Sequence, residues 1–220
     1  MKKLIYYFLV IQITFVIGNI PVYSQGKSLI SIKSGIAISN QTWISKEDNT
    51  TTNGNYITGL LVGLYYDYRI SNYLHIRTGM DYSQSGSYLP YSWNEYYESN
   101  KEKNRAKVLF NYLSFEILSK IKISGIKFFP YLIAGPKFDF LIKKTFMLLN
   151  FEQVPNMSNI DYGFVIGIGS EINPFKNLLV TLELRYCQGF NKISTLSSRT
   201  DVISVRNHLF EFTTGLGLIF

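Results

Sequence analysis

Two residues of this chain, His75 and His208, carry an imidazole that could serve acid–base or metal chemistry near neutral pH. His208 lies in an alternating segment typical of a strand, where residues two apart share a face. A hydrolytic base there needs a nucleophile at position 206 or 210, and these positions hold Arg206 and Phe210. The sequence therefore predicts no catalytic residue around His208, and we expect an interfacial anchoring role for it.

His75 has the residue types around it that could ligate a metal, because imidazole and carboxylate together suit divalent ions. The candidate partners are Asp81, Glu116 and Glu183, with one imidazole available on that side and Arg77 competing for the same carboxylates. Buried charges persist in proteins when they are paired. The pattern therefore favours a network of salt bridges, and we expect no metal, no cofactor and no enzymatic activity.

Eight segments with alternating side chains carry these residues, and alternation of this kind is typical of β-strands. No linker or shift of composition divides them, which indicates one domain. We expect the strands at residues 28–40, 55–70, 73–86, 107–122, 127–142, 160–172, 177–190 and 207–220.

The connections between the predicted strands alternate strictly between two classes. Three are tight, at residues 71–72, 123–125 and 173–176, and the others are long and polar: 41–54, 87–106, 143–159 and 191–206. An outer-membrane barrel has short periplasmic turns and long outside loops, whereas a soluble sandwich has no reason to place every long loop at one end. We therefore expect a protein of the bacterial outer membrane with periplasmic termini and extracellular loops.

One face of the predicted strands is oily, and the other collects both the charges and the glycines. The oily face includes Ile30, Ile32, Ile36, Ile38, Leu60, Val62, Leu64, Tyr66, Tyr68, Leu74, Ile76, Met80, Val180, Leu182, Leu184 and Tyr186. The opposite face carries Lys33, Asp67, Arg69, His75, Arg77, Asp81, Glu116, Lys120, Lys137, Asp139, Glu171, Glu183, Arg185 and Glu211.

Glycine on the charged face indicates the inside of a small barrel. Gly weakens a strand at a solvated surface, whereas long charged side chains inside an eight-stranded barrel need small neighbours. The sequence therefore predicts an all-β fold, an eight-stranded antiparallel up-and-down transmembrane β-barrel with a packed polar lumen. Conduction is not expected, because an open aqueous channel needs about twice as many strands.

The first 25 residues have the features of a secretory signal peptide. Lys2 and Lys3 precede an apolar run that ends near Gly18 and Pro21, which predicts a signal peptide at 1–25 and a barrel domain at 26–220. Without Lys2 and Lys3 the 22 basic side chains become 20 against 15 acidic ones, a net charge of +5. This excess is too small to indicate nucleic-acid binding. Cys187 is the single cysteine, and we expect it to be buried and inert.

The chain ends in the stretch EFTTGLGLIF, whose last residue is the aromatic Phe220. Its oily face would meet lipid and its small or charged face would meet the lumen. Phe220 resembles the C-terminal aromatic by which outer-membrane barrels are recognised for assembly. We therefore expect the barrel-assembly machinery to be a partner, with Phe220 as the assembly signal.

The second long loop, residues 87–106, is the most distinctive of the expected exposed segments. Beside a charged run it carries the aromatic residues Tyr88, Tyr91, Trp93, Tyr96 and Tyr97. Exposed loop aromatics are typical recognition anchors, so this loop could dock a cell-surface protein or a polysaccharide. The alternative, which we favour, is that the aromatics extend the rim at headgroup level while the charges contact lipopolysaccharide.

Several stretches together resemble the PorT-like outer-membrane β-barrel family of Bacteroidetes. They are GLLVGLYYDYRISNYLHIRTGMDYSQSG at 59–86, NYLSFEILSKIKI, PYLIAGPKFDFLI, DYGFVIGIGSEI and LELRYCQGFNKIS. The resemblance implies a small integral outer-membrane protein, and some relatives serve a protein secretion system.

The expected function is therefore that of a non-enzymatic structural or accessory component linked to protein secretion or envelope assembly. Surface adhesion through the aromatic loop 87–106 is the alternative. A lipid-modifying enzyme acting through His208 is a third hypothesis, and a soluble sandwich is the alternative for the fold.

Overall fold

Eight long strands form where side chains alternate between oily and polar. In the computed structural model these strands are β1 (Leu29–Ile44), β3 (Ile57–Arg69), β4 (Leu74–Tyr88), β5 (Lys107–Lys122), β6 (Phe129–Met147), β8 (Ile160–Phe175), β9 (Leu178–Gly189) and β11 (Asp201–Ile219). Three short strands join them at one end: β2 (Thr51–Asn53), β7 (Asn156–Met157) and β10 (Ser194–Ser198).

The structure describes residues 28–44, 51–88, 107–123, 129–147, 156–175, 177–190, 194–198 and 201–220. The predicted signal peptide at 1–25 lies outside these ranges. Within them, no helix has the length and apolar character needed to cross a membrane.

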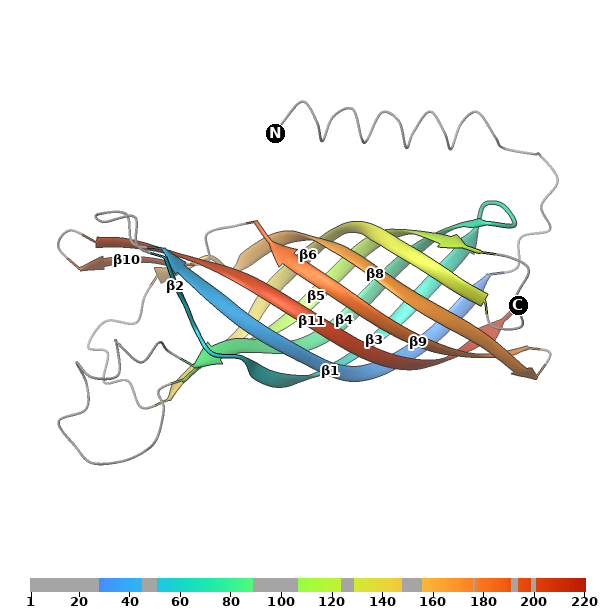
Figure 1. The fold of residues 1–220 in the computed structure, drawn as a ribbon, viewed down its shortest axis with the longest axis horizontal. Coiled ribbons are helices and arrows are strands. Elements are labelled where there is room, and N and C mark those ends of the chain that lie inside the picture. The colour runs from blue at the N-terminus through green and yellow to red at the C-terminus, as the bar shows by residue number, and fades with distance from the viewer. Residues whose placement is uncertain are drawn as a thin grey trace, which may run out of the picture.

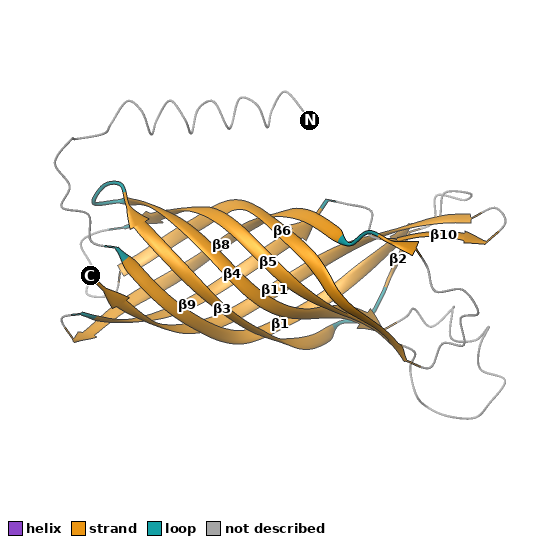
Figure 2. Cartoon of the chain, turned by 180° about the vertical axis from the view of Figure 1, so that it is seen from behind, coloured by secondary structure: helices purple, strands orange, loops and turns teal. Residues whose placement is uncertain are grey.

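The eight long strands form a closed antiparallel sheet. Each pairs with the next along the chain, and β1 pairs with β11 from Leu29–Ile219 to Ile44–Ser204. Figures 1 and 2 show the resulting tilted barrel from opposite sides. Because β1 pairs with β11, neither of these strands is left as an open edge, as a sheet in lipid requires. The predicted eight-stranded antiparallel barrel is confirmed.

The two ends of the barrel differ. One end, here called the turn end, carries the C-terminus and the tight connection between β3 and β4, where Ile70 N donates to Leu74 O at 3.0 Å. The opposite end, here called the loop end, carries the short strands β2 and β10 (Figure 1). The long strands that end there are separated by the longer stretches of sequence, such as residues 89–106 between β4 and β5. The alternation of short and long connections is therefore as predicted.

The predicted loop boundaries were wrong, because several strands continue beyond them. β1 runs to Ile44, β6 runs to Met147 and β11 begins at Asp201, so parts of the predicted loops 41–54, 143–159 and 191–206 are paired strand. At the turn end, β8 likewise continues to Phe175 through the predicted turn. Polar composition indicated contact with water, but strand pairing persists where the barrel wall extends past the apolar band.

The two faces of the wall have the predicted compositions. Every residue predicted to face outward is exposed or half-exposed, as in Ile32 and Leu64. The charged residues of the other face are buried, except Arg69 and Asp139, which are half-buried near opposite ends. Charge therefore lies inside the barrel and apolar surface outside it, the reverse of a soluble protein.

Candidate functional site: the filled lumen

Arg77 on β4 is the centre of an ion-pair cluster in the half of the lumen nearer the turn end. Its Nη2 donates to Asp67 Oδ2 at 2.9 Å, and its Nη1 donates to Glu183. Lys33 and the hydroxyl of Tyr131 donate to the same Glu183 oxygen. Glu183 thus joins β1, β4, β6 and β9 across the barrel, and its charge is shared between two buried cations.

Lys120 on β5 extends this cluster to β8. Its ammonium donates to Asp67 and to Glu171 on β8. Lys122 lies nearer the turn end and pairs with the other oxygen of Glu171 at 2.6 Å. The inner cations are therefore held by carboxylates of neighbouring or facing strands, as buried charges require.

Arg69 and His75 were predicted to belong to this network, and the structure places them at its margin. Arg69 is half-buried at the turn end, where its guanidinium donates to the Ser71 carbonyl and the Asn72 side chain. His75 is buried and shares a small hollow with Arg69 and Lys122. Among the described residues, no hydrogen bond connects Arg69 or His75 to the carboxylates of the cluster.

Arg185 on β9 is the centre of a second cluster, nearer the loop end. Its Nη1 donates to Glu116 Oε1 at 2.9 Å, and its Nε donates to Glu211 Oε2 at 2.7 Å. Lys137 donates to the other oxygen of Glu211 at 3.1 Å and lies 3.6 Å from Asp139. This cluster ties β5, β6, β9 and β11 together.

Two tyrosines that the sequence analysis did not single out, Tyr65 and Tyr131, fill the space around the charges. The Tyr65 ring lies between the two clusters, with Lys33 Nζ 4.4 Å and the Arg185 guanidinium carbon 5.6 Å from its centroid. Its hydroxyl donates to Asp81 Oδ2 at 3.3 Å. Such cation–π contacts stabilise desolvated cations. Tyr65 shares the strand phase of Asp67, which was the signal in the sequence that could have identified it.

Glycines provide the room for these rings. A Cβ at Gly79 would overlap the Tyr65 ring, and a Cβ at Gly169 would overlap Tyr131. The glycines of the charged face are therefore part of the packing of the lumen, as their position in the sequence predicted.

Neutral polar side chains continue the packing toward the loop end. Gln41 donates to Asn207 Oδ1 at 3.0 Å and accepts from Ser87 Oγ at 2.9 Å, while Asn207 Nδ2 donates to the Tyr112 hydroxyl at 3.3 Å. Gln41 and Ser87 had been assigned to loops, so the analysis missed them. Their partners depend on the register between strands, which alternation alone does not give.

The charged set does not converge on a centre for chemistry. Of the described residues, no three His, Cys, Asp or Glu side chains gather as a group that could hold a metal ion. Cys187 is buried as predicted, in an apolar cluster with Ala37, Leu118 and Val165. The arrangement cross-links strands and fills the barrel.

Comparison with known proteins agrees with this geometry. A model of the family described as "Outer membrane protein beta-barrel domain" matches residues 23–195. The chain belongs to this family. It is therefore a protein of the bacterial outer membrane, as the sequence predicted. A search of curated proteins found no match.

Solved outer-membrane barrels share the fold at low sequence identity. OprG from Pseudomonas aeruginosa is 12% identical, with a TM-score of 0.56 over 88% of this chain and 96% of that chain. AlkL is 11% identical, with a TM-score of 0.54 over 90% and 92%. A major outer membrane protein from Thermus thermophilus is 12% identical, with a TM-score of 0.53 over 90% and 100%. Identities this low establish the fold alone.

On the outer face of this outer-membrane barrel, His208 has the polar neighbours that the sequence analysis did not find. Its Nε2 lies 3.0 Å from Thr42 Oγ1 on β1, and its Nδ1 lies 3.2 Å from the Tyr186 hydroxyl on β9. The sequence analysis looked for a nucleophile only at positions 206 and 210 of the same strand, whereas these hydroxyls come from the two neighbouring strands. The second ring nitrogen contacts a phenol rather than the carboxylate that usually orients a catalytic histidine.

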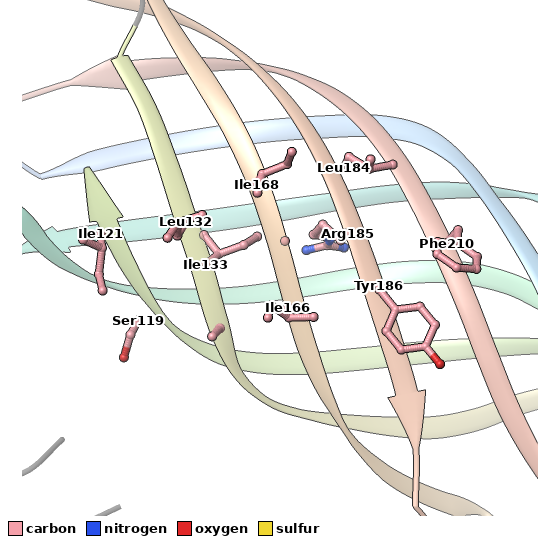
Figure 3. A pocket seen from close by; sticks show the side chains of 12 residues that line it. Ser119, Ile121, Leu132, Ile133, Ile166, Ile168, Leu184, Arg185, Tyr186 and Phe210 are labelled. Carbon is pink, nitrogen blue, oxygen red and sulfur yellow. The ribbon is translucent and has the colours of Figure 1, made fainter. Parts of the chain in front are cut away.

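The lipid-facing wall of this outer-membrane barrel has an apolar hollow of about 440 Å³ (Figure 3). The small residues Ser119 and Ala134, which are cross-strand partners, lie in it among larger apolar side chains such as Leu132, Ile166 and Leu184. Ser119 and Tyr186 are its hydroxyl-bearing lining residues, and the charge of Arg185 is engaged by Glu116 and Glu211 in the lumen. The hollow therefore suits a lipid acyl chain rather than a reaction.

The aromatic set predicted in loop 87–106 is described only at its first member. Tyr88 ends β4, paired with Lys107. Tyr91, Trp93, Tyr96 and Tyr97 lie outside the described residues.

Proposed function

We propose that this outer-membrane barrel is a non-enzymatic scaffold that acts through its two ends, as a structural or accessory component of protein secretion or envelope assembly. In this proposal the turn end faces the periplasm and the loop end faces outward, the usual orientation of barrels with short periplasmic turns. Lipopolysaccharide, the barrel-assembly machinery and secretion or surface proteins are its proposed partners.

The filled lumen is the observation that supports this function. Lys33, Arg77, Lys120, Lys137 and Arg185 span the barrel interior, and each is at most 2% exposed. Charged side chains that line a water-filled channel would be hydrated, whereas these are packed against carboxylates and tyrosine rings. A barrel whose interior is filled by side chains offers its loops, its turns and its outer wall for function.

The secretion role is supported by the likeness of residues 59–86 and the later strands to PorT-like proteins. We expect deletion of the gene in the native host to reduce the exported proteins, with other outer-membrane barrels at normal levels. Wild-type protein should restore export, and a variant with residues 89–106 replaced by a short Gly-Ser linker should not. Quantitative proteomics of culture medium and outer membranes measures both.

An unchanged set of exported proteins in the deletion strain would discard the secretion role. If export is unchanged and the shortened loop abolishes binding to a surface ligand, adhesion replaces it. In that variant, a heat-dependent shift on SDS gels establishes that the barrel is folded.

The proposal that this protein is not an enzyme leads to a prediction for His208. We expect His208→Ala to leave the mass profile of lipid A unchanged, because the ring is held by Thr42 and Tyr186 hydroxyls and has no carboxylate to orient it. Mass spectrometry of lipid A from wild-type, deletion and variant strains is the measurement. A profile that changes on deletion and equally in His208→Ala, but not in Arg206→Gln, would establish a lipid-modifying enzyme.

A further inference from the structure

The wall of the barrel has a step where β3 and β4 separate. The ladder between these strands ends at Leu61–Ser83, although β3 reaches Ile57 and β4 continues to Tyr88. β4 passes so close to the inner side of β3 that a Cβ on Gly59 would overlap a backbone carbonyl of β4. Between the Leu61–Ser83 pair and Tyr88, which exchanges two backbone hydrogen bonds with Asn55 at 3.0 and 3.1 Å, β4 therefore bends toward the lumen.

The inward bend of β4 is fixed to β1, the strand beyond β3. Gly86 N donates to Ser39 Oγ at 2.8 Å, and the same hydroxyl donates to Gly86 O at 2.9 Å. Gly86 has a φ of 154°, a conformation that other residues rarely adopt, and a Cβ there would overlap Val108 O. The inward bend of β4 is therefore fixed by these hydrogen bonds and by the backbone conformation of Gly86.

A hollow of about 440 Å³ lies on the outer side of this step. Its sides come from the start of β3 and from β5, and its floor is the displaced β4. Two cross-strand pairs, Gln84–Asn111 and Tyr88–Lys107, contribute four of its side chains. The remaining lining residues are Tyr56, Ile57, Thr58, Gly59, Ser85 and Leu109.

The lining has the chemistry of a site for an anionic, hydroxyl-rich group. It contains one cation, Lys107, and no acid. Two carboxamides, a threonine hydroxyl and two tyrosines provide donors, acceptors and ring surface. Ser85 belongs to the floor of the hollow, with its side chain on the lumen face, because its cross-strand partner Phe110 is fully buried there.

The depth of the hollow places it at the boundary between the apolar band and water. Toward the turn end, the outward face of β5 is apolar, with Leu113, Phe115 and Ile117 exposed. The next outward positions toward the loop end are Asn111, Leu109 and Lys107. Lys143, the cross-strand partner of Asn111, adds a second exposed cation beside it. This change from apolar to polar and basic is typical of the level of lipid headgroups.

We propose that this hollow binds the phosphorylated sugar headgroup of an outer-leaflet glycolipid. Lys107 holds a phosphate, the Asn111 side chain hydrogen-bonds the sugar, and the acyl chains lie along the apolar wall below. Gln84 forms part of the wall of the hollow, where its Oε1 accepts from Leu60 N at 3.3 Å and its Nε2 donates to the Tyr82 hydroxyl at 3.3 Å. Basic pockets at a membrane surface bind anionic headgroups in this way. The site does not depend on a role in secretion, but it requires that the loop end face outward.

Native mass spectrometry of the full-length mature protein in detergent tests this site, with bisphosphorylated lipid A as the probe. We expect the wild type to bind lipid A in preference to phosphatidylglycerol, which has a phosphate but no sugar. Lys107→Gln should weaken lipid A binding about tenfold, the equivalent of about 1.4 kcal/mol. Asn111→Ala should also weaken binding while hardly changing the free energy of unfolding, because Asn111 is half-buried on the outer face of β5.

Arg206→Gln is the matched control, because Arg206 is an exposed cation on β11, away from the hollow. We expect it to bind lipid A as the wild type does. Equal weakening by Arg206→Gln and Lys107→Gln would overturn the site in favour of general surface charge. Equal binding of phosphatidylglycerol would overturn the sugar recognition, and unaltered binding in both Lys107→Gln and Asn111→Ala would overturn the proposal as a whole.

Discussion

Replacing Glu183 with glutamine is expected to lower the free energy of unfolding by about 3–5 kcal/mol, the usual cost of removing one partner from a buried ion pair. The side chain accepts from Lys33, Arg77 and Tyr131 inside the barrel. Glutamine keeps the shape but takes away the charge that both cations share. Arg77 retains Asp67, whereas Glu183 is the only carboxylate paired with Lys33 among the described residues. Urea unfolding in lipid vesicles, followed by tryptophan fluorescence, measures the loss.

A double-mutant cycle identifies the cause of that loss. Because Lys33→Met removes the cation that Glu183→Gln leaves unpaired, the double variant should be more stable than the sum of the single effects predicts, by about 1–3 kcal/mol. Asp139→Asn is the control, since that carboxylate is half-buried and 3.6 Å from a lysine that keeps Glu211. A Glu183→Gln protein as stable as Asp139→Asn would contradict the view that the lumen network holds the strands together.

The division of residues between the two faces of the wall could be predicted from the sequence, because successive side chains of a strand point to opposite faces. Lys33, Arg77, Glu116 and Glu183 were assigned to the lumen on this basis, and all are buried there. The lipid outside reverses the usual rule for burial, and glycine on the charged face was the sign of that reversal. The alternation of side chains, however, does not show which charged residues form ion pairs.

Contacts between strands could not be predicted, since they depend on register and on where pairing stops. Thr42 meets His208 although Asn40 is the residue directly opposite on β1. The hollow beside Lys107 exists because the β3–β4 ladder ends early. The alternation of apolar and polar side chains does not reveal where a ladder ends. The same limit applies to strand ends, where polar residues such as Gln41 were assigned to loops and instead pack in the lumen.

Replacing Phe220 with alanine should greatly reduce the amount of barrel in the outer membrane while hardly changing the stability of the folded protein. The side chain is 65% exposed on the lipid-facing side, so its removal leaves no cavity, and exposed changes of this kind alter stability by about 0.5 kcal/mol or less. Closure at the turn end uses the backbone instead. Phe220 N donates to Ser28 O at 3.0 Å, and Ser28 N donates to Phe220 O at 2.9 Å.

Phe212→Ala separates recognition from lipid contact, because Phe212 lies on the same strand and the same outward face and is 52% exposed. Both variants should refold into detergent like the wild type, since neither loses a backbone pair or a lumen contact. Under the proposed role of Phe220 as an assembly signal, only Phe220→Ala should be depleted from outer-membrane fractions, because Phe212 shares the lipid contact but not that role. Equal levels of the two variants in membranes would mean that Phe220 acts only as one more lipid-facing aromatic.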